Sequence, residues 1–269
     1  MLGSCRAARA ARGQGLAHDP FDLGGRVALV TGGSRGIGRA IARLLARHRA
    51  TVAVASRKLE GCEAVAAEIR ADGGAASAHA CHIGEPEQIA ATFDALDAAH
   101  GRIDILVNNA ATNPYFGPAI DMDHGAWQKT VDVNIRGYFL ASIQAARRML
   151  PAGRGAIVNV ASVNAFRPMD GQACYSLTKA AIVNMTQGLA KEWARHGIRV
   201  NALVPGIVET RFAAAIHEDA RLRAAIERQV PIGRVAQPDE MAGAVLYLVS
   251  DAASYTTGSC LTADGGWLA

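Results

Sequence analysis

The sequence predicts one doubly wound α/β domain in which helices flank a seven-stranded parallel sheet. Seven short apolar runs, rich in β-branched residues, alternate along the chain with segments of helical periodicity. Short runs that are apolar throughout are typical of strands buried on both faces, as in a parallel sheet. A glycine-rich turn joins the first strand directly to the first helix. No composition change marks a second domain, so we expect residues 21–269 to fold as one dinucleotide-binding catalytic unit.

The elements follow one another in strict alternation. Each expected strand is a run of Val, Ile, Leu or Ala, and each expected helix repeats its apolar residues at a spacing near 3.6. Proline opens the helix at 86–100, where its missing N–H costs nothing. The strands are expected at residues 27–30, 51–55, 75–81, 103–107, 156–160, 198–204 and 259–262. The helices are expected from residue 37 onward and at 60–71, 86–100, 123–150, 172–196 and 238–250.

One insert interrupts the alternation. Residues 207–231 favour helix, are bounded by prolines, and follow the carboxyl end of the strand at 198–204. Ligands bind beyond the carboxyl ends of strands in such sheets. We therefore expect this insert to act as a substrate lid, although a plain crossover helix would have the same pattern.

The ends and the composition exclude several classes of protein. Arg6, Arg9 and Arg12 against Asp19 place +2 of the net charge of +4 in the first twenty residues, and the body is nearly balanced. A nucleic-acid partner is therefore not expected. We interpret residues 1–20 as a disordered extension, with a weak organelle-targeting peptide as the alternative.

Membrane and metal chemistry have no support in the sequence. No run of about 18 apolar residues is present, so no membrane span is expected. The five cysteines are scattered and odd in number, without Cys-x-x-Cys spacing. This usage indicates a reducing compartment, taken here as the cytoplasm, and no metal site.

The glycine turn indicates a dinucleotide. Gly32, Gly36 and Gly38 are spaced Gly-x-x-x-Gly-x-Gly between a strand and a helix. Such a turn leaves free N–H groups at a helix N-terminus, where a pyrophosphate binds.

The next strand end indicates which dinucleotide. NAD-binding units carry a carboxylate about 20 residues past the glycines for the ribose hydroxyl. Here no Asp or Glu occurs between Asp22 and Glu60, and Arg35 and Arg57 stand in the turn and at the strand end. Guanidinium groups match a 2′-phosphate, so we predict NADP(H).

Tyr175 and Lys179 are the expected chemical centre. Four residues apart on a helix, they lie on one face. A neighbouring cation favours phenolate, so we expect Lys179 to lower the pKa of Tyr175 from about 10. A phenol tuned in this way exchanges a proton with a carbonyl or alcohol oxygen.

Several motifs occur together in one order: Thr31-Gly32-x-x-x-Gly36-x-Gly38, Asn108-Asn109-Ala110, Asn134, Ser162, Tyr175-x-x-x-Lys179 and Pro205-Gly206. Together they resemble the short-chain dehydrogenase/reductase family over residues 26–266. The resemblance implies a Rossmann-type fold with strand order 3-2-1-4-5-6-7. It also implies NAD(P)-dependent hydride transfer and a homotetramer or homodimer.

The resemblance also implies roles for individual residues. Tyr175 is the general acid or base, Lys179 assists it and binds the nicotinamide ribose, Ser162 donates to the substrate oxygen, and Asn134 holds a water that joins Lys179 to solvent. Thr210 is expected at the carboxamide. The residues expected to bind the cofactor are Gly32, Ser34, Arg35, Gly36, Ile37, Gly38, Ser56, Arg57, Lys58, His82, Ile83, Asn108, Ala110, Tyr175, Lys179, Pro205, Gly206, Val208 and Thr210.

Two positions depart from the family pattern. Ala111 replaces a glycine, and His82-Ile83 replaces the Asp-Val or Asp-Leu whose carboxylate meets adenine. An adenine contact by His82 and a plain strand-end histidine are both open. With Ser56-Arg57-Lys58 and the stretch 113–117, this departure resembles the NADP-dependent carbonyl reductases that act on retinal and other aromatic or dicarbonyl compounds.

An apolar and aromatic wall is expected on the substrate side, which favours a lipophilic ketone, aldehyde or secondary alcohol. The residues expected there are Tyr115, Phe116, Val163, Asn164, Phe166, Met169, Ile207 and Phe212.

Two alternatives remain open. A 3-oxoacyl-thioester reductase acting on acyl-carrier protein would need a basic rim for its acidic partner, which Arg136, Arg147 and Arg148 could supply. A non-catalytic protein that senses NADP(H) would use the same fold without turnover.

Overall fold

The computed structural model of the protein describes residues 19–210 and 220–269. Within them, seven parallel strands form one sheet in the order β3-β2-β1-β4-β5-β6-β7, as expected. Each strand begins and ends within about two residues of its expected position. The strands are β1 (Val27–Thr31), β2 (Thr51–Ser56), β3 (Ala75–Ala80), β4 (Ile105–Asn108), β5 (Gly155–Val160), β6 (Ile198–Pro205) and β7 (Cys260–Ala263).

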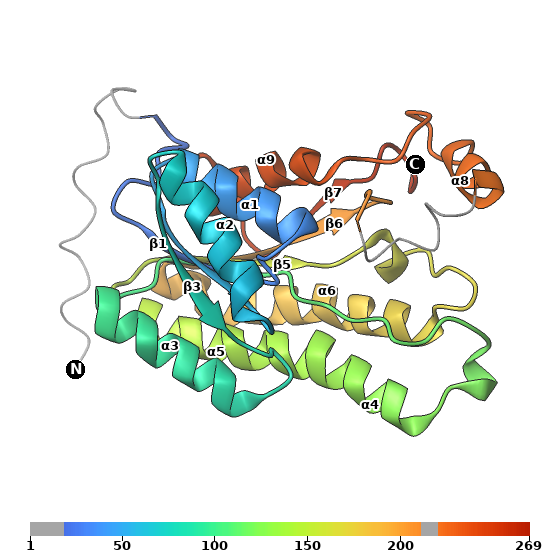
Figure 1. Ribbon diagram of the computed structural model, residues 1–269, viewed down its shortest axis with the longest axis horizontal. Coiled ribbons are helices and arrows are strands. Elements are labelled where there is room, and N and C mark those ends of the chain that lie inside the picture. The colour runs from blue at the N-terminus through green and yellow to red at the C-terminus, as the bar shows by residue number, and fades with distance from the viewer. Residues whose placement is uncertain (1–18, 211–219) are drawn as a thin grey trace, which may run out of the picture.

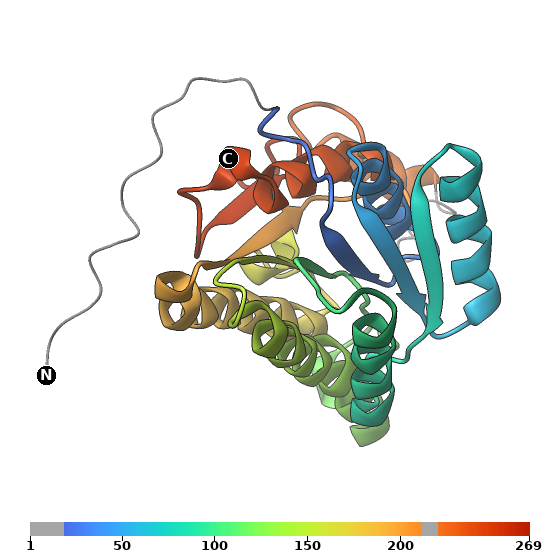
Figure 2. The ribbon, with the colours of Figure 1, turned by 90° about the vertical axis from the view of Figure 1, so that its left-hand side faces the viewer.

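Helices cover both faces of the sheet (Figures 1 and 2). One face carries α1 (Gly36–Arg47), α2 (Leu59–Ala71) and α9 (Pro238–Val249), and the other carries α3 (Pro86–His100), α5 (Gly137–Met149) and α6 (Ala173–Trp193). Because side chains alternate along a strand, β1 supplies both cores: Val30 packs with α1, and Leu29 packs with α3 and α5. Burial on both faces explains why the strands are apolar throughout.

The helix expected at 123–150 is continuous but not uniform. It consists of α4 (His124–Val131), a π-helical turn at Asp132–Arg136, and α5. A π turn accommodates one extra residue and is common at functional sites. Asn134 lies in this turn and is completely buried.

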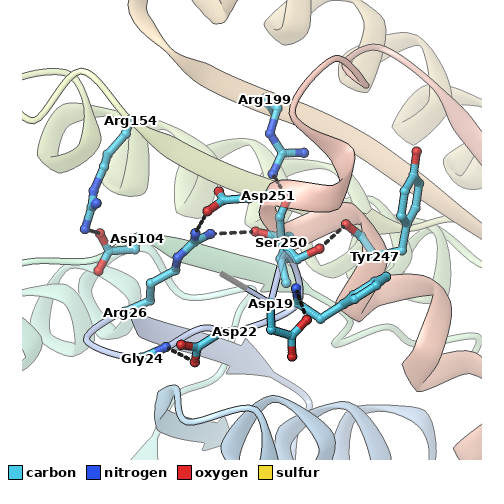
Figure 3. Close-up of polar contacts among 12 residues, drawn as sticks. Asp19, Asp22, Gly24, Arg26, Asp104, Arg154, Arg199, Tyr247, Ser250 and Asp251 are labelled. Carbon is cyan, nitrogen blue, oxygen red and sulfur yellow. Dashed lines mark hydrogen bonds and ion pairs between the residues drawn. The ribbon is translucent and has the colours of Figure 1, made fainter. Parts of the chain in front are cut away.

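Paired charges stabilise the amino-end edge of the sheet (Figure 3). Arg26 forms an ion pair with Asp251 at 2.7 Å. Asp104 is 5% exposed and accepts hydrogen bonds from the backbone N–H of Val27 and from Arg154. Arg199 donates to the carbonyl oxygens of residues 248 and 250. Asp104 also pairs with Arg102.

The insert is described only in part. Its second half contains α8 (Ala220–Glu227), whereas residues 211–219, including Phe212, lie outside the described residues, as do residues 1–18. Among the described helices, none has the length and apolar character needed to cross a bilayer. The same ranges contain no group of three or more His, Cys, Asp or Glu side chains placed to hold a metal ion.

Candidate active site

Tyr175 and Lys179 lie on one face of α6, at the carboxyl-end edge of the sheet. Both are buried, Tyr175 to 8% exposure and Lys179 to 1%. The Lys179 Nζ donates to the carbonyl oxygen of Val160 at 2.8 Å and lies 5.4 Å from the centre of the Tyr175 ring. A second buried phenol, Tyr138, places its ring 5.6 Å from the same Nζ.

Ser162 lies beside Tyr175. It follows the last residue of β5, Val160, by two positions, so the strand that anchors Lys179 also places Ser162. The Ser162 hydroxyl is hydrogen-bonded to the Tyr175 side chain. A phenol and a hydroxyl that meet in this way can both contact one oxygen atom of a substrate.

The pKa of Tyr175 moves in the direction opposite to the one we expected. Burial raises the pKa of the phenol above its usual value, and the Ser162 hydrogen bond offsets only part of the increase. Lys179 does not counter this effect, since burial lowers its own pKa to about 7. Desolvation disfavours the charged form of each group, so the Tyr175 phenol keeps its proton at neutral pH.

Asn134 joins the loop after β4 to α6. Its Nδ2 donates to the Thr112 carbonyl at 2.9 Å and to the Thr178 hydroxyl at 3.1 Å, and its Oδ1 accepts from the Thr112 N–H. Thr178 in turn donates to the carbonyl of Tyr175. Asn134 therefore connects this loop to the helix that carries Tyr175. The water expected beside it stays a prediction.

The glycine turn has the conformation that its sequence predicts. Gly32 and Gly36 have φ of 65° and 53°, a region that favours glycine. A Cβ on Gly38 would lie 2.3 Å from the Gly32 carbonyl oxygen. Arg35, the N-cap of α1, gives no side-chain capping bond, so the first N–H groups of α1 suit a pyrophosphate.

Asn109 and Thr31 hold this turn, and the sequence analysis missed both roles. The Asn109 Nδ2 donates to the carbonyl oxygens of Thr31 and Gly32 at 3.0 and 3.2 Å. The Thr31 hydroxyl accepts from the N–H groups of Asn109 and Ala110. The motif Asn108-Asn109-Ala110 was the available signal. It could not tell which of the two asparagines faces the turn.

The Asn108 side chain faces the core and not the turn. Its side chain is completely buried and donates to Ser142 Oγ at 3.0 Å and to Asn159 Oδ1 at 2.9 Å. These hydrogen bonds join β4 to β5 and α5. The contact that we expected between Asn108 and the cofactor stays a prediction.

The arginines around α1 and β2 differ in whether they form ion pairs. On α1, Arg39 pairs with Glu68, and Arg43 pairs with Glu68 and Asp72. Arg35 and Arg57 are exposed, and the ion pairs of the described residues include neither. Two unpaired guanidinium groups beside the glycine turn are the environment that a 2′-phosphate requires.

Other residues that we expect to bind the cofactor lie just after β2, β3 and β6 or at their last residue. His82 Nδ1 accepts from the N–H of Gly84 at 3.1 Å, and Ile83 is buried in the core, so an adenine contact by His82 stays a prediction. Ser56 Oγ donates to the carbonyl of Lys58. Beyond β6, a Cβ on Gly206 would lie 2.7 Å from Asp264 Cα.

The other expected cofactor residues lie near the same strand ends. Ser34 contacts the start of α2, Ile37 packs on the core beside β1, Val208 is buried beyond β6, and Thr210 lies against Gly36.

Six of the expected substrate residues, all except Ile207 and Phe212, come from two loops that contact each other. The N–H of Gly117 donates to the carbonyl of Gly171, which brings the loop with Tyr115 and Phe116 against the loop with Met169. Phe116 and Phe166 are 71% and 52% exposed. Val163 and Asn164 are buried, and Ile207 packs on the same core cluster as Val163.

Comparisons with known proteins agree with this geometry. A family model described as enoyl-(acyl carrier protein) reductase matches residues 32–268. The chain is 39% identical over 249 residues to dehydrogenase/reductase SDR family member 4 of Oryctolagus cuniculus, covering 93% of this chain and 95% of that protein. It is 40% identical over 247 residues to D-threitol dehydrogenase of Mycolicibacterium smegmatis, covering 92% and 94%.

A solved structure extends the agreement to three dimensions. The gluconate 5-dehydrogenase of Burkholderia cenocepacia, in complex with NADP and tartrate, superimposes with a TM-score of 0.90 at 36% identity. The match covers 93% of this chain and 98% of that one. The protein belongs to the short-chain dehydrogenase/reductase family, and it is an oxidoreductase of Rossmann fold.

Proposed function

We propose that the protein interconverts a lipophilic ketone or aldehyde and the corresponding secondary or primary alcohol with NADP(H), using Tyr175 as general acid and base. The observation that carries the proposal is the hydrogen bond between Ser162 and Tyr175 above the buried Lys179. These groups can bind one substrate oxygen, donate a proton to it and stabilise its developing charge.

NADP(H) fits the residues that are present. Arg35 and Arg57, which form no ion pair within the described residues, suit its 2′-phosphate, and the glycine turn and the N-terminus of α1, without a side-chain cap, suit its pyrophosphate. The relative from Burkholderia was solved with NADP. When bound, the cofactor supplies or accepts the hydride, and the protein positions the substrate and moves the proton.

The reductive direction is favoured by the state of Tyr175. Burial raises the pKa of this phenol, so it holds its proton at neutral pH. A protonated phenol donates to a carbonyl oxygen, which is the step that reduction requires. Oxidation needs phenolate and gains as the pH rises.

The acyl-carrier-protein alternative has less support. Arg148 pairs with Asp94 and Asp97 of α3, and it lies with Arg147 in the last turn of α5, which leads to the amino end of β5. Arg136 pairs with Asp132 and donates to the Gly84 carbonyl. Arg147 and Arg148 are thus at the far edge from Tyr175, and Arg136 is engaged by its neighbours.

Assembly and location are further parts of the proposal. Exposed apolar side chains on α4, α5 and α6, namely Trp127, Phe139 and Leu177, support a homotetramer or homodimer. Four cysteines of the described chain are free thiols, which supports the cytoplasm.

A substrate screen tests the proposal. Oxidation of NADPH or NADH is followed by absorbance with aromatic ketones, dicarbonyl compounds and an acetoacetyl thioester. We expect turnover of the ketones with NADPH. Turnover of the thioester alone would favour the carrier-protein alternative, and no turnover of any carbonyl would favour a protein that only senses NADP(H).

A further inference from the structure

Three carboxamides meet at the start of α6, close in sequence to Tyr175. The Oε1 of Gln172 accepts from Asn164 Nδ2 at 3.2 Å and from Asn113 Nδ2 at 3.4 Å. Asn164 is 3% exposed, and Asn113 comes from the loop that precedes Tyr115. We call Asn113, Asn164 and Gln172 the amide trio.

The amide trio fixes the orientation of the Gln172 side chain. Because Oε1 accepts two hydrogen bonds, Nε2 faces away from both asparagines. Its contact among the described residues is the Met169 Sδ at 4.0 Å, and a thioether is a weak acceptor. Gln172 therefore presents an N–H donor whose strong acceptor is still to be supplied.

Short sequence separations and backbone hydrogen bonds connect the amide trio to Tyr175 and Ser162. Gln172 directly precedes α6 and lies three residues before Tyr175, a rise of about 4.5 Å along one helical turn. The carbonyl of Gln172 accepts from the N–H of Ser176. Asn164 follows Ser162 by two residues, and its N–H donates to the Ser162 hydroxyl at 3.2 Å.

The other hydroxyl nearby is already engaged. The Tyr115 hydroxyl donates to the Pro118 carbonyl at 2.7 Å, so it does not compete for the same ligand. The amide trio carries no charge, and a carboxylate is bound best by a guanidinium or ammonium group. The ligand chemistry that fits a fixed neutral N–H donor is therefore a hydroxyl or carbonyl oxygen.

We propose that the Gln172 amide binds a second oxygen of the substrate, on the carbon next to the reacting one. The substrate class is then α-hydroxy ketones and the vicinal diols that their reduction yields, which rests on the proposed function of the site. With NADPH as reductant, the carbonyl carbon gains a hydride, its oxygen gains the Tyr175 proton, and the neighbouring hydroxyl is unchanged. A site built to bind a hydroxyl strongly rejects the analogue that lacks it.

The test compares 2-hydroxycyclohexanone with cyclohexanone in the wild-type enzyme and in Gln172→Met, which keeps the side-chain length without the amide. We expect the wild type to prefer the hydroxy ketone at least about thirtyfold in kcat/KM, and Gln172→Met to reduce this preference to about threefold or less. Gln128→Met, an exposed change on α4, serves as the control and should keep the preference. An equal kcat/KM for both ketones in the wild type, or an unchanged preference in Gln172→Met, would overturn the proposal.

A binding measurement separates this proposal from the proposed function. Dissociation constants of trans-1,2-cyclohexanediol and cyclohexanol are measured in the presence of NADP+ with Tyr175→Phe, which does not require turnover. We expect the diol to bind about tenfold more tightly than cyclohexanol, and the added Gln172→Met change to remove that difference. Equal binding of both alcohols refutes the role of Gln172, whereas failure of the proposed function alone leaves the difference intact.

Discussion

The two edges of the central sheet use polar side chains in different ways. At the amino-end edge, Asp104 accepts from three groups and Arg199 is satisfied by backbone carbonyls. At the carboxyl-end edge, Arg35, Arg57 and the Gln172 Nε2 keep donors that strong acceptors of the described chain do not use. A donor without a strong acceptor in the described chain therefore indicates a ligand site better than a high local charge does.

The presence of a large cavity is also a poor indicator of the active site. A cavity of about 650 Å³ lies at the amino-end edge, lined by Arg26, Arg154 and Arg199 among others. These cations are engaged by Asp251, Asp104 and backbone carbonyls (Figure 3). We therefore assign this network to stability and the opposite edge to chemistry.

The largest effect that we expect from a substitution at the carboxyl-end edge is on the use of NADPH. Arg35→Ala with Arg57→Ala removes the two guanidinium groups that lack an ion pair in the described part of the chain, so we expect kcat/KM for NADPH to fall about 100-fold, with NADH changed by less than about threefold. Steady-state kinetics with both cofactors measure this. Arg39→Ala with Arg43→Ala, which break ion pairs with Glu68 and Asp72, form the matched control. Equal losses with both cofactors would place the 2′-phosphate elsewhere.

A substitution at the amino-end edge should lower the free energy of unfolding and leave kcat unchanged. Asp104→Asn removes the buried carboxylate that accepts from Val27, Arg102 and Arg154, and losing hydrogen bonds to a charged group costs about 2 kcal/mol. Asp251→Asn breaks a more exposed pair and should cost less than about 1 kcal/mol. Urea unfolding gives both values, and kinetics should show an unchanged kcat for both variants. A large loss of kcat in Asp104→Asn at wild-type stability would contradict the division between the edges.

The buried cation at the catalytic edge makes a smaller, pH-dependent contribution. Burial lowers the pKa of Lys179 to about 7, from 10.5 when unfolded, so between these values the unfolded chain binds more protons. Stability then rises with pH from 7 towards 10, at a slope approaching about 1.4 kcal/mol per pH unit, and is unaffected by this group below pH 7. The difference in unfolding free energy between wild type and Lys179→Met, measured by urea titration at several pH values, should show this slope. A flat difference over that range would mean that Lys179 stays charged in the folded protein.

The sequence was sufficient for the features that depend on spacing. Alternating apolar runs predicted the sheet, glycine spacing predicted the turn, and four-residue spacing predicted that Tyr175 and Lys179 share a face of α6. Each of these follows from local geometry.

Features that depend on burial or on a shift of one residue could not be predicted. Asn108 and Asn109 are adjacent, and only the packing shows which one enters the core. The π turn around Asn134 adds one residue to a helix whose apolar pattern continues through it. The pKa of Tyr175 was predicted in the wrong direction because spacing revealed the nearby cation and not the desolvation.

The most direct measurement compares the two buried phenols next to Lys179. Tyr175→Phe and Tyr138→Phe each remove one hydroxyl near the same Nζ, and only Tyr175 is hydrogen-bonded to Ser162. For NADPH-dependent reduction of a ketone, we expect kcat to fall at least about 1,000-fold in Tyr175→Phe and less than about threefold in Tyr138→Phe. Substantial turnover by Tyr175→Phe, in a variant that unfolds like the wild type, would contradict the assignment of Tyr175 as the proton donor.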